Sequence, residues 1–143
     1  MSVGLKPSVL AEVFESQENM RDFIFTVKSK KTGVEKVFKI GKSHYKDHFY
    51  LWCYVKIGRH FSKLGFYRSG DIIFKKELNM SDGALAISWI IKNCKNKNFE
   101  KIENTMDVCS ISRCRICNKR LTTFRSIING MGEICLNNKN NGV

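Results

Sequence analysis

The chain has 143 residues, of which 25 are Lys or Arg and 13 are Asp or Glu, so its formal net charge is +12 at pH 7. This length allows one domain core, alone or with a small added module, and excludes two large catalytic domains. No run of residues approaches the roughly 18 apolar residues of a membrane span, and the first residues lack the apolar segment of a signal peptide. We therefore expect a cytoplasmic protein with no membrane partner.

The positive charge is concentrated in two segments. Residues 28–80 carry 13 basic and 4 acidic side chains, and residues 109–143 carry 6 basic and 1 acidic side chain. Codon bias can also enrich a protein in Lys and Asn, but a uniform bias would not spare the first 27 residues or residues 81–108. The distribution therefore favours a functional anionic partner, such as a phosphate polymer, over a merely solvated basic surface.

The first half of the chain contains a short helix followed by strands. Apolar residues between positions 8 and 15 recur at helical spacing. Five later runs are rich in β-branched and aromatic residues and are separated by polar or Gly-containing turns. These runs predict a mainly antiparallel sheet of about five strands, over residues 23–27, 34–40, 49–57, 63–68 and 72–75.

A helix capped by Ser81 or Asp82 follows the predicted strands. One continuous apolar stripe runs along it, formed by Ala84, Ile87, Ile90, Ile91 and Cys94. The helix should therefore lie across one face of the sheet. The sequence predicts an α+β fold in two parts, a basic α+β domain over residues 1–105 and a small cysteine-bearing module over residues 106–143 that ends in a frayed tail.

Four of the six cysteines fall in the C-terminal part, at Cys109, Cys114, Cys117 and Cys135. A C-x2-C pair brings two thiolates to one tight turn, and two further sulfurs complete a tetrahedral zinc site. Cys114 and Cys117 form the pair. Cys109 is the nearest candidate for the fourth ligand, because Cys53 lies in a predicted strand and Cys94 in the helix stripe. Four thiolates leave no open coordination position, so we interpret this zinc as structural.

Disulfides, a redox motif and unpaired core thiols are the alternative interpretations of these cysteines. Disulfides fit poorly with a chain that shows no secretion signal. The thioredoxin-type context of a redox C-x-x-C motif is missing. Unpaired thiols have no reason to cluster in an Arg- and Gly-rich segment, so zinc is the cofactor that the spacing favours.

Three short stretches at 114–122, 126–127 and 130–135 read C-R-I-C-N-K-R-L-T, S-I and G-M-G-E-I-C. This pattern resembles the C-terminal signature of a family of uncharacterised phage and bacterial proteins, C-x2-C-G-R-x-L-T, then S-I, then G-I-G-P-x-C. The resemblance implies a zinc-knuckle module carried by viral or mobile-element proteins behind a β-rich part, and hence a location in the cytoplasm of a host cell. It implies no activity.

The departures from the family pattern are ones that the backbone can accommodate. Asn118 replaces a Gly, and Asn is the non-Gly residue that best tolerates a positive φ. Met131 keeps an apolar side chain where the family has Ile. Glu133 replaces Pro and fits the first turn of a helix, which would place Cys135 near a helix N-terminus, where a thiolate is favoured.

Aromatic and basic side chains supply candidate nucleic-acid contacts on the sheet and around the knuckle. Strict alternation over 49–57 sends three aromatic residues and a lysine to the face opposite the aliphatic core. Unpaired bases stack on such surfaces, although packing under a helix or a neighbouring chain is the alternative. The knuckle arginines either contact phosphates or balance thiolates and carbonyls. The candidate contacts are Tyr50, Trp52, Tyr54, Lys56, Arg59, Lys63, Arg68, Arg113, Arg115, Lys119, Arg120 and Arg125.

No catalytic constellation stands out in the sequence. All three histidines precede the knuckle, the acidic residues of the strand region are isolated among lysines, and there is no Gly-rich phosphate loop. We therefore expect a non-enzymatic, zinc-stabilised protein of a phage or mobile element that binds DNA or RNA mainly through phosphate contacts. One alternative is a host-takeover or counter-defence protein that binds an acidic host protein. Another is a scaffold whose aromatic strand pairs subunits, and the oligomeric state stays open.

Overall fold

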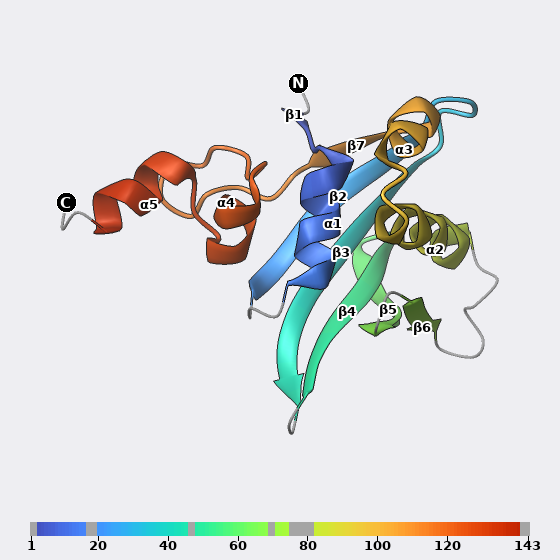
Figure 1. Cartoon of the computed structure of the whole chain (residues 1–143), viewed down its shortest axis with the longest axis horizontal. Helices are drawn as coiled ribbons and strands as arrows, with labels where there is room; N and C mark the ends of the chain where they lie inside the picture. Colours follow the sequence, from blue (N-terminus) through green and yellow to red (C-terminus); the bar gives the residue numbers. More distant parts are fainter. Residues whose placement is uncertain (1–2, 17–19, 46–47, 69–70, 75–81, 141–143) are drawn as a thin grey trace.

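The computed structural model describes residues 3–16, 20–45, 48–68, 71–74 and 82–140. They form one antiparallel sheet, helices packed on one face of it, and a small C-terminal lobe beside its edge (Figure 1). The α+β class expected from the sequence is therefore confirmed.

The sheet has six strands of four or more residues in the described part of the chain, and one strand of two. Their order across the sheet is β1-β7-β2-β3-β4-β5-β6, and all neighbours are antiparallel. The strands are β1 (Val3–Gly4), β2 (Met20–Ser29), β3 (Glu35–Tyr45), β4 (His48–Ile57), β5 (His60–Arg68), β6 (Asp71–Phe74) and β7 (Met106–Ser110).

The five strands expected from the sequence are present as β2 to β6, and the sheet is larger because β1 and β7 were not predicted. β7 reads MDVCS, and this short run carries one β-branched residue, Val108, so it lacks the pattern of a strand. It nevertheless pairs with β2 on one side and β1 on the other. The sheet therefore extends beyond the boundary expected near residue 105.

Five helices lie in the described part of the chain: α1 (Pro7–Glu15), α2 (Asp82–Lys95), α3 (Phe99–Thr105), α4 (Phe124–Asn129) and α5 (Glu133–Asn140). The predicted α2 stripe is confirmed, since all five of its residues are buried. The sequence predicts a frayed tail from residue 137, where the chain becomes low in complexity, but the chain is helical as far as Asn140, the end of α5. The rest of the expected tail lies outside the described residues.

The core lies between the sheet and the helices. Alternation along the strands buries one face of the sheet, where Phe23, Phe25, Phe38 and Ile40 are at most 1% exposed. Helices α1, α2 and α3 cover this face (Figure 1), and their buried apolar side chains belong to the same core. The C-terminal lobe contributes Leu121, Ile127, Met131 and Leu136 to the same core. The lobe is therefore packed onto the sheet domain by apolar contacts.

A bulge in β5 sets which side chains reach the other face of the sheet. Cys53 of β4 lies opposite Gly65, whereas the next residue, Tyr54, lies opposite Lys63. The extra residue, Leu64, is 1% exposed and points into the core. The bulge therefore places Lys63 beside Tyr54 on the face away from the helices.

Gly65→Ala should destabilise the fold by about 1–3 kcal/mol, as overpacking of a filled site does. A Cβ at this position would overlap the carbonyl oxygen of Ile73 and lie 2.8 Å from Cα of Phe74, both in the paired strand β6. The measurement is the free energy of unfolding in urea. Gly4→Ala is the matched control, because a Cβ there meets nothing within 4 Å. Equal stability of the two variants would contradict the prediction.

Candidate metal centre and the open sheet face

Three cysteines of the C-terminal lobe come together. The Sγ atoms of Cys114, Cys117 and Cys135 all lie within 4.8 Å of one another. Tetrahedral zinc, with Zn–S bonds of roughly 2.3 Å, spaces its sulfurs by about 3.8 Å, so only small adjustments are needed to close on an ion. These three side chains can therefore hold a metal ion.

The C-x2-C turn is a closed backbone knuckle. The amide of Cys114 donates to the carbonyl of Lys119 at 2.7 Å, and the amide of Asn118 donates to the carbonyl of Cys114 at 2.9 Å. Asn118 has φ 65°, as expected for the residue that replaces Gly in the family pattern. The amides of Ile116 and Cys117 point at Sγ of Cys114, at 3.4 and 3.5 Å. The knuckle is thus shaped to hold a thiolate.

The sulfurs of the group influence each other's protonation. The amide of Cys117, with those of Gly132 and Ile116, lowers the pKa of Cys114 to about 6 against the opposing effect of burial. The pKa of Cys135 is raised to about 11, first because its thiol is hydrogen-bonded to Cys117 and also because the neighbouring sulfurs repel a further negative charge. A divalent cation removes this repulsion, so all three side chains can bind it as thiolates.

Cys109 does not belong to this group. It lies in β7, opposite Thr26 of β2 and Gly4 of β1. Its neighbours Val108 and Ser110 are buried, so Cys109 points to the other face of the sheet. The expectation that Cys109 supplies the fourth sulfur rests on sequence proximity and does not account for β7. The described residues therefore form a three-sulfur group and not the expected four-sulfur site.

The remaining two cysteines have structural positions, as expected. Cys53 is buried in β4, and burial raises the pKa of its thiol. Burial also raises the pKa of Cys94 in α2 to about 12, and its Sγ donates to the carbonyl of Pro7 at 3.9 Å. Neither thiol is available as a thiolate ligand at neutral pH.

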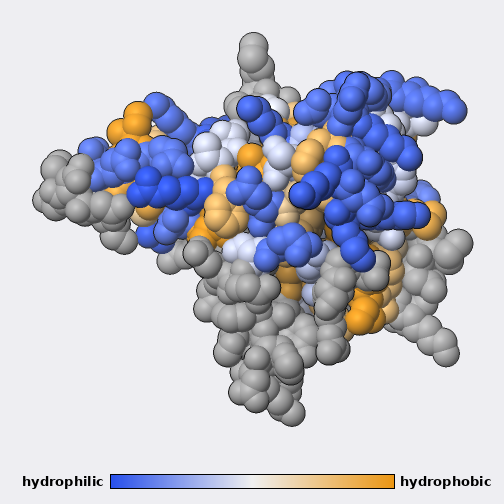
Figure 2. Space-filling model, viewed as in Figure 1, coloured by the Kyte–Doolittle hydropathy of each residue, from blue (hydrophilic) through white to orange (hydrophobic). Residues whose placement is uncertain are grey.

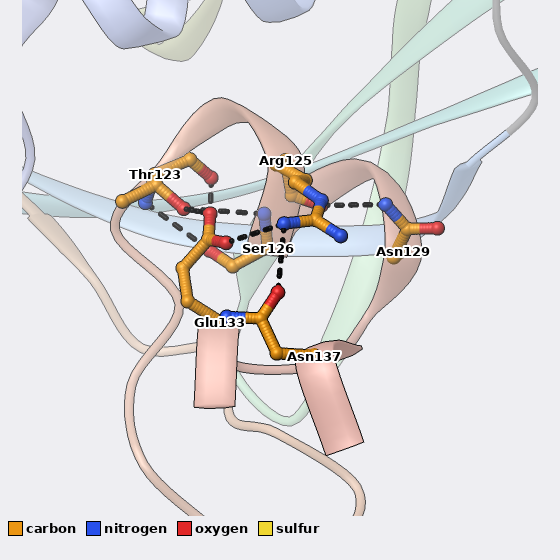
Figure 3. Close-up of polar contacts among 6 residues, drawn as sticks. All are labelled: Thr123, Arg125, Ser126, Asn129, Glu133 and Asn137. Atoms are coloured by element: carbon orange, nitrogen blue, oxygen red, sulfur yellow. Dashed lines mark hydrogen bonds and ion pairs between the residues drawn. The ribbon is translucent and has the colours of Figure 1, made fainter. Parts of the chain in front are cut away.

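A polar network between α4 and α5 positions Cys135 (Figure 3). Thr123 caps α4 in a reciprocal capping box with Ser126. The carboxylate of Glu133 accepts from Oγ1 of Thr123 at 2.9 Å and from Nη1 of Arg125 at 3.1 Å. Arg125 also donates to Oδ1 of Asn137 at 3.2 Å. The network thereby holds the first turn of α5, from which Cys135 reaches the knuckle.

The other arginines of the lobe also make local contacts. Nη1 of Arg113 donates to the carbonyl of Asn118 at 3.0 Å, and Nη1 of Arg120 donates to the carbonyl of Ser110 at 2.8 Å. Nη2 of Arg115 lies 3.3 Å from Sδ of Met131, which is buried as the apolar plug expected from the sequence. Lys119 is exposed. These contacts favour the interpretation that the arginines support the lobe.

The sheet face opposite the helices, called here the open face, carries aromatic rings beneath two lysines. Nζ of Lys63 lies 4.1 Å from the ring centroid of Trp52 and 5.9 Å from that of Tyr54. Nζ of Lys39 lies 4.5 Å from the Tyr54 ring. The expected alternation of β4 is thus present. Helix α2 packs on the aliphatic side, where a Cβ at Gly83 would lie 3.2 Å from Val55, so it does not cover the aromatic side.

The other predicted contacts of the sheet belong to β4, β5 and the turn between them. Lys56 and Arg59 are exposed where β4 turns into β5. Tyr50 and Arg68 lie in β4 and β5, and their side chains are outside the described part. Lys39, Phe61 and Phe66 also lie on the open face and were not predicted from the sequence. Lys39 lies opposite Tyr54, and this pairing can be recognised only when the β3–β4 register is known.

Comparisons with known proteins identify no relative of the chain. No family model matches the chain, and searches of the curated proteins and of the solved structures find no match. The resemblance of residues 114–135 to the phage and bacterial signature therefore stays a prediction. Within the described ranges, no helix is long and apolar enough to cross a membrane.

Cys117→Ser should abolish tight metal binding, because it removes one of only three grouped sulfurs. Cys109→Ser should leave metal binding intact, because that side chain lies in β7 and apart from the group. The measurement is the Zn²⁺ retained per chain after gel filtration. Loss of metal in the Cys109 variant would restore the four-sulfur assignment.

Arg125→Ala should lower the affinity for Zn²⁺ by about tenfold, the lower end of the effect of removing a positioning partner. Electrostatics alone predicts a higher affinity for Zn²⁺ in this variant, since the substitution removes a positive charge near a cation site. Lys119→Ala removes the same charge without touching the network, and Asn129→Ala removes only a bond to the Arg125 carbonyl within α4. A competition titration with a chelator measures all three, and equal affinities for the Arg125 and Lys119 variants would refute the positioning role.

Proposed function

We propose that the protein binds nucleic acid on the open face, mainly through phosphate contacts, and that its cysteine group holds a zinc ion that stabilises the C-terminal lobe. The observation that carries the proposal is the pair of ammonium groups, from Lys39 and Lys63, held over Trp52 and Tyr54. The resemblance of residues 114–135 adds the expectation that a phage or mobile element encodes the protein.

The two ammonium groups are well placed to meet an anion. A ring face attracts a cation within about 6 Å, so the rings of Trp52 and Tyr54 fix where the charges lie. In the described part of the chain, no carboxylate pairs with Lys63, and Lys39 pairs with the exposed Asp22 at 3.6 Å. Phosphate oxygens can therefore bind Lys63 directly and Lys39 in exchange for the exposed Asp22, which favours association with a polyanion.

The rings beneath the lysines favour unpaired bases. When a phosphate draws a lysine away from its ring, the ring face becomes available for stacking, which contributes roughly 1–3 kcal/mol per base. Phe66 supports this surface, since its ring centroid lies 5.2 Å from that of Trp52. A duplex keeps its base faces stacked inside, so a single strand uses this surface more fully.

The two tryptophans of the chain report separately on the two sides of the sheet. Trp52 lies on the open face, whereas Trp89 lies in α2 on the helix side. In Trp89→Phe protein, added oligo-dT or oligo-U should change the emission of Trp52. In Trp52→Phe protein, the emission of Trp89 should stay constant. A response from Trp89 with none from Trp52 would place binding elsewhere and refute the open face.

Lysine variants test the phosphate contacts in the same assay. Lys63→Gln should weaken binding and reduce the slope of log K against log salt by about 0.7, the contribution of one phosphate contact on a single strand. Lys92→Gln is the matched control, because Lys92 is an exposed lysine of α2. A salt-independent affinity, or equal slopes for the two variants, would contradict phosphate binding by Lys63.

A further inference from the structure

The cysteine group offers three sulfurs, whereas a closed structural zinc site has four protein ligands. Among the side chains that the structure describes, no fourth Cys, His, Asp or Glu joins Cys114, Cys117 and Cys135. Three protein ligands and one free position are the arrangement of zinc sites that bind an external ligand. The group therefore differs from the closed site that the sequence predicts.

The nearby candidates for a fourth ligand are already used or lie elsewhere. Both carboxylate oxygens of Glu133 are hydrogen-bonded, one to Thr123 and the other to Arg125 (Figure 3). Cys109 belongs to β7. His60 opens β5, which lies on the far side of the sheet from the lobe (Figure 1).

The group is accessible from solvent. Cys117 is exposed and Cys135 is partly exposed, whereas Cys114 is buried. Two large apolar side chains next to these cysteines are exposed as well, Ile116 to 67% and Ile134 to 65%. Figure 2 shows hydrophobic side chains among hydrophilic ones on the surface of the C-terminal lobe. Exposed apolar side chains that adjoin two of the ligands in sequence suit an external ligand with an apolar body better than they suit bare water.

We propose that the metal ion held by Cys114, Cys117 and Cys135 keeps one coordination position for a thiolate from outside the chain. This inference rests on metal binding by the group, which is part of the proposed function. A zinc ion with three thiolates prefers a soft fourth ligand. The exposed basic residues Arg115 and Lys119 beside the knuckle favour an anionic thiolate, and the exposed Ile116 and Ile134, which adjoin Cys117 and Cys135 in sequence, favour one carried on an apolar body.

Co²⁺ is the probe for this position, because its absorption reports the number and kind of its ligands. The full chain is loaded with one Co²⁺ and titrated in separate arms with 2-mercaptoethanol and with a Leu-Cys-Leu peptide. The thiolate-to-cobalt band should rise by about one third as three thiolates become four. A Leu-Ser-Leu peptide should cause no change. A lower half-saturating concentration for the cysteine peptide identifies a protein side chain as the ligand source, and equal values identify a small thiol.

Controls separate this inference from the functions on which it rests. Gel filtration must show that one cobalt per chain is retained, so that the added thiol has joined the ion and not extracted it. Cys109→Ser should respond like the wild type, whereas a band that falls by about a quarter in this variant would show a four-sulfur site and overturn the inference. A cobalt band that does not change when thiols are added overturns the inference of an open coordination position and leaves the metal site itself intact. A missing band overturns the metal site too, while Trp52 emission still tests nucleic-acid binding.

Discussion

Strand β7 occupies the position between β1 and β2, and its backbone hydrogen bonds connect the sheet to the C-terminal lobe. The connection continues past the strand, because the amides of Ile111 and Ser112 both donate to the carbonyl of Ile24 in β2. The amide of Ile24 in turn donates to Oγ of Ser112 at 2.7 Å. The knuckle begins two residues later, so this pairing determines where the three grouped cysteines lie relative to the sheet. It also directs Cys109 away from them.

The parts of the fold that could be predicted from the sequence are those with a long periodic signal. Strands β2 to β5 have nine or more residues each, and α2 carries a full apolar stripe, so their apolar patterns identify them. β7 and α3 have five and seven residues, and their structure depends on the elements beside them. The bulge at Leu64 could not be predicted either. Gly65 is needed there because β6 leaves no room for a Cβ, and this constraint exists only once the two strands are paired.

The candidate sites also contain features that could be predicted from local sequence and features that depend on tertiary structure. The knuckle was predictable because a C-x2-C turn and a positive φ at Asn118 are local properties of a few residues. The position of Cys135 in the first turn of α5 follows from Glu133 at the start of that helix. The position of Cys109 apart from the group was not predictable, since proximity in sequence says little about a residue inside a strand. Lys39 needs the register of two strands, and the role of Arg125 needs the packing of two helices.

The pairing of β7 with β2 also has a consequence for the order in which the chain folds. Val27 and Val108 face each other across this pair although about 80 residues separate them in sequence, and contacts of such long range slow the search for the native topology. During synthesis, β2 emerges well before β7. Its outer edge therefore keeps free backbone donors and acceptors until the last quarter of the chain arrives, and an unpaired edge of this kind can recruit another chain. Late closure of this edge makes the nascent protein most vulnerable to aggregation just before its cysteine-bearing lobe is made.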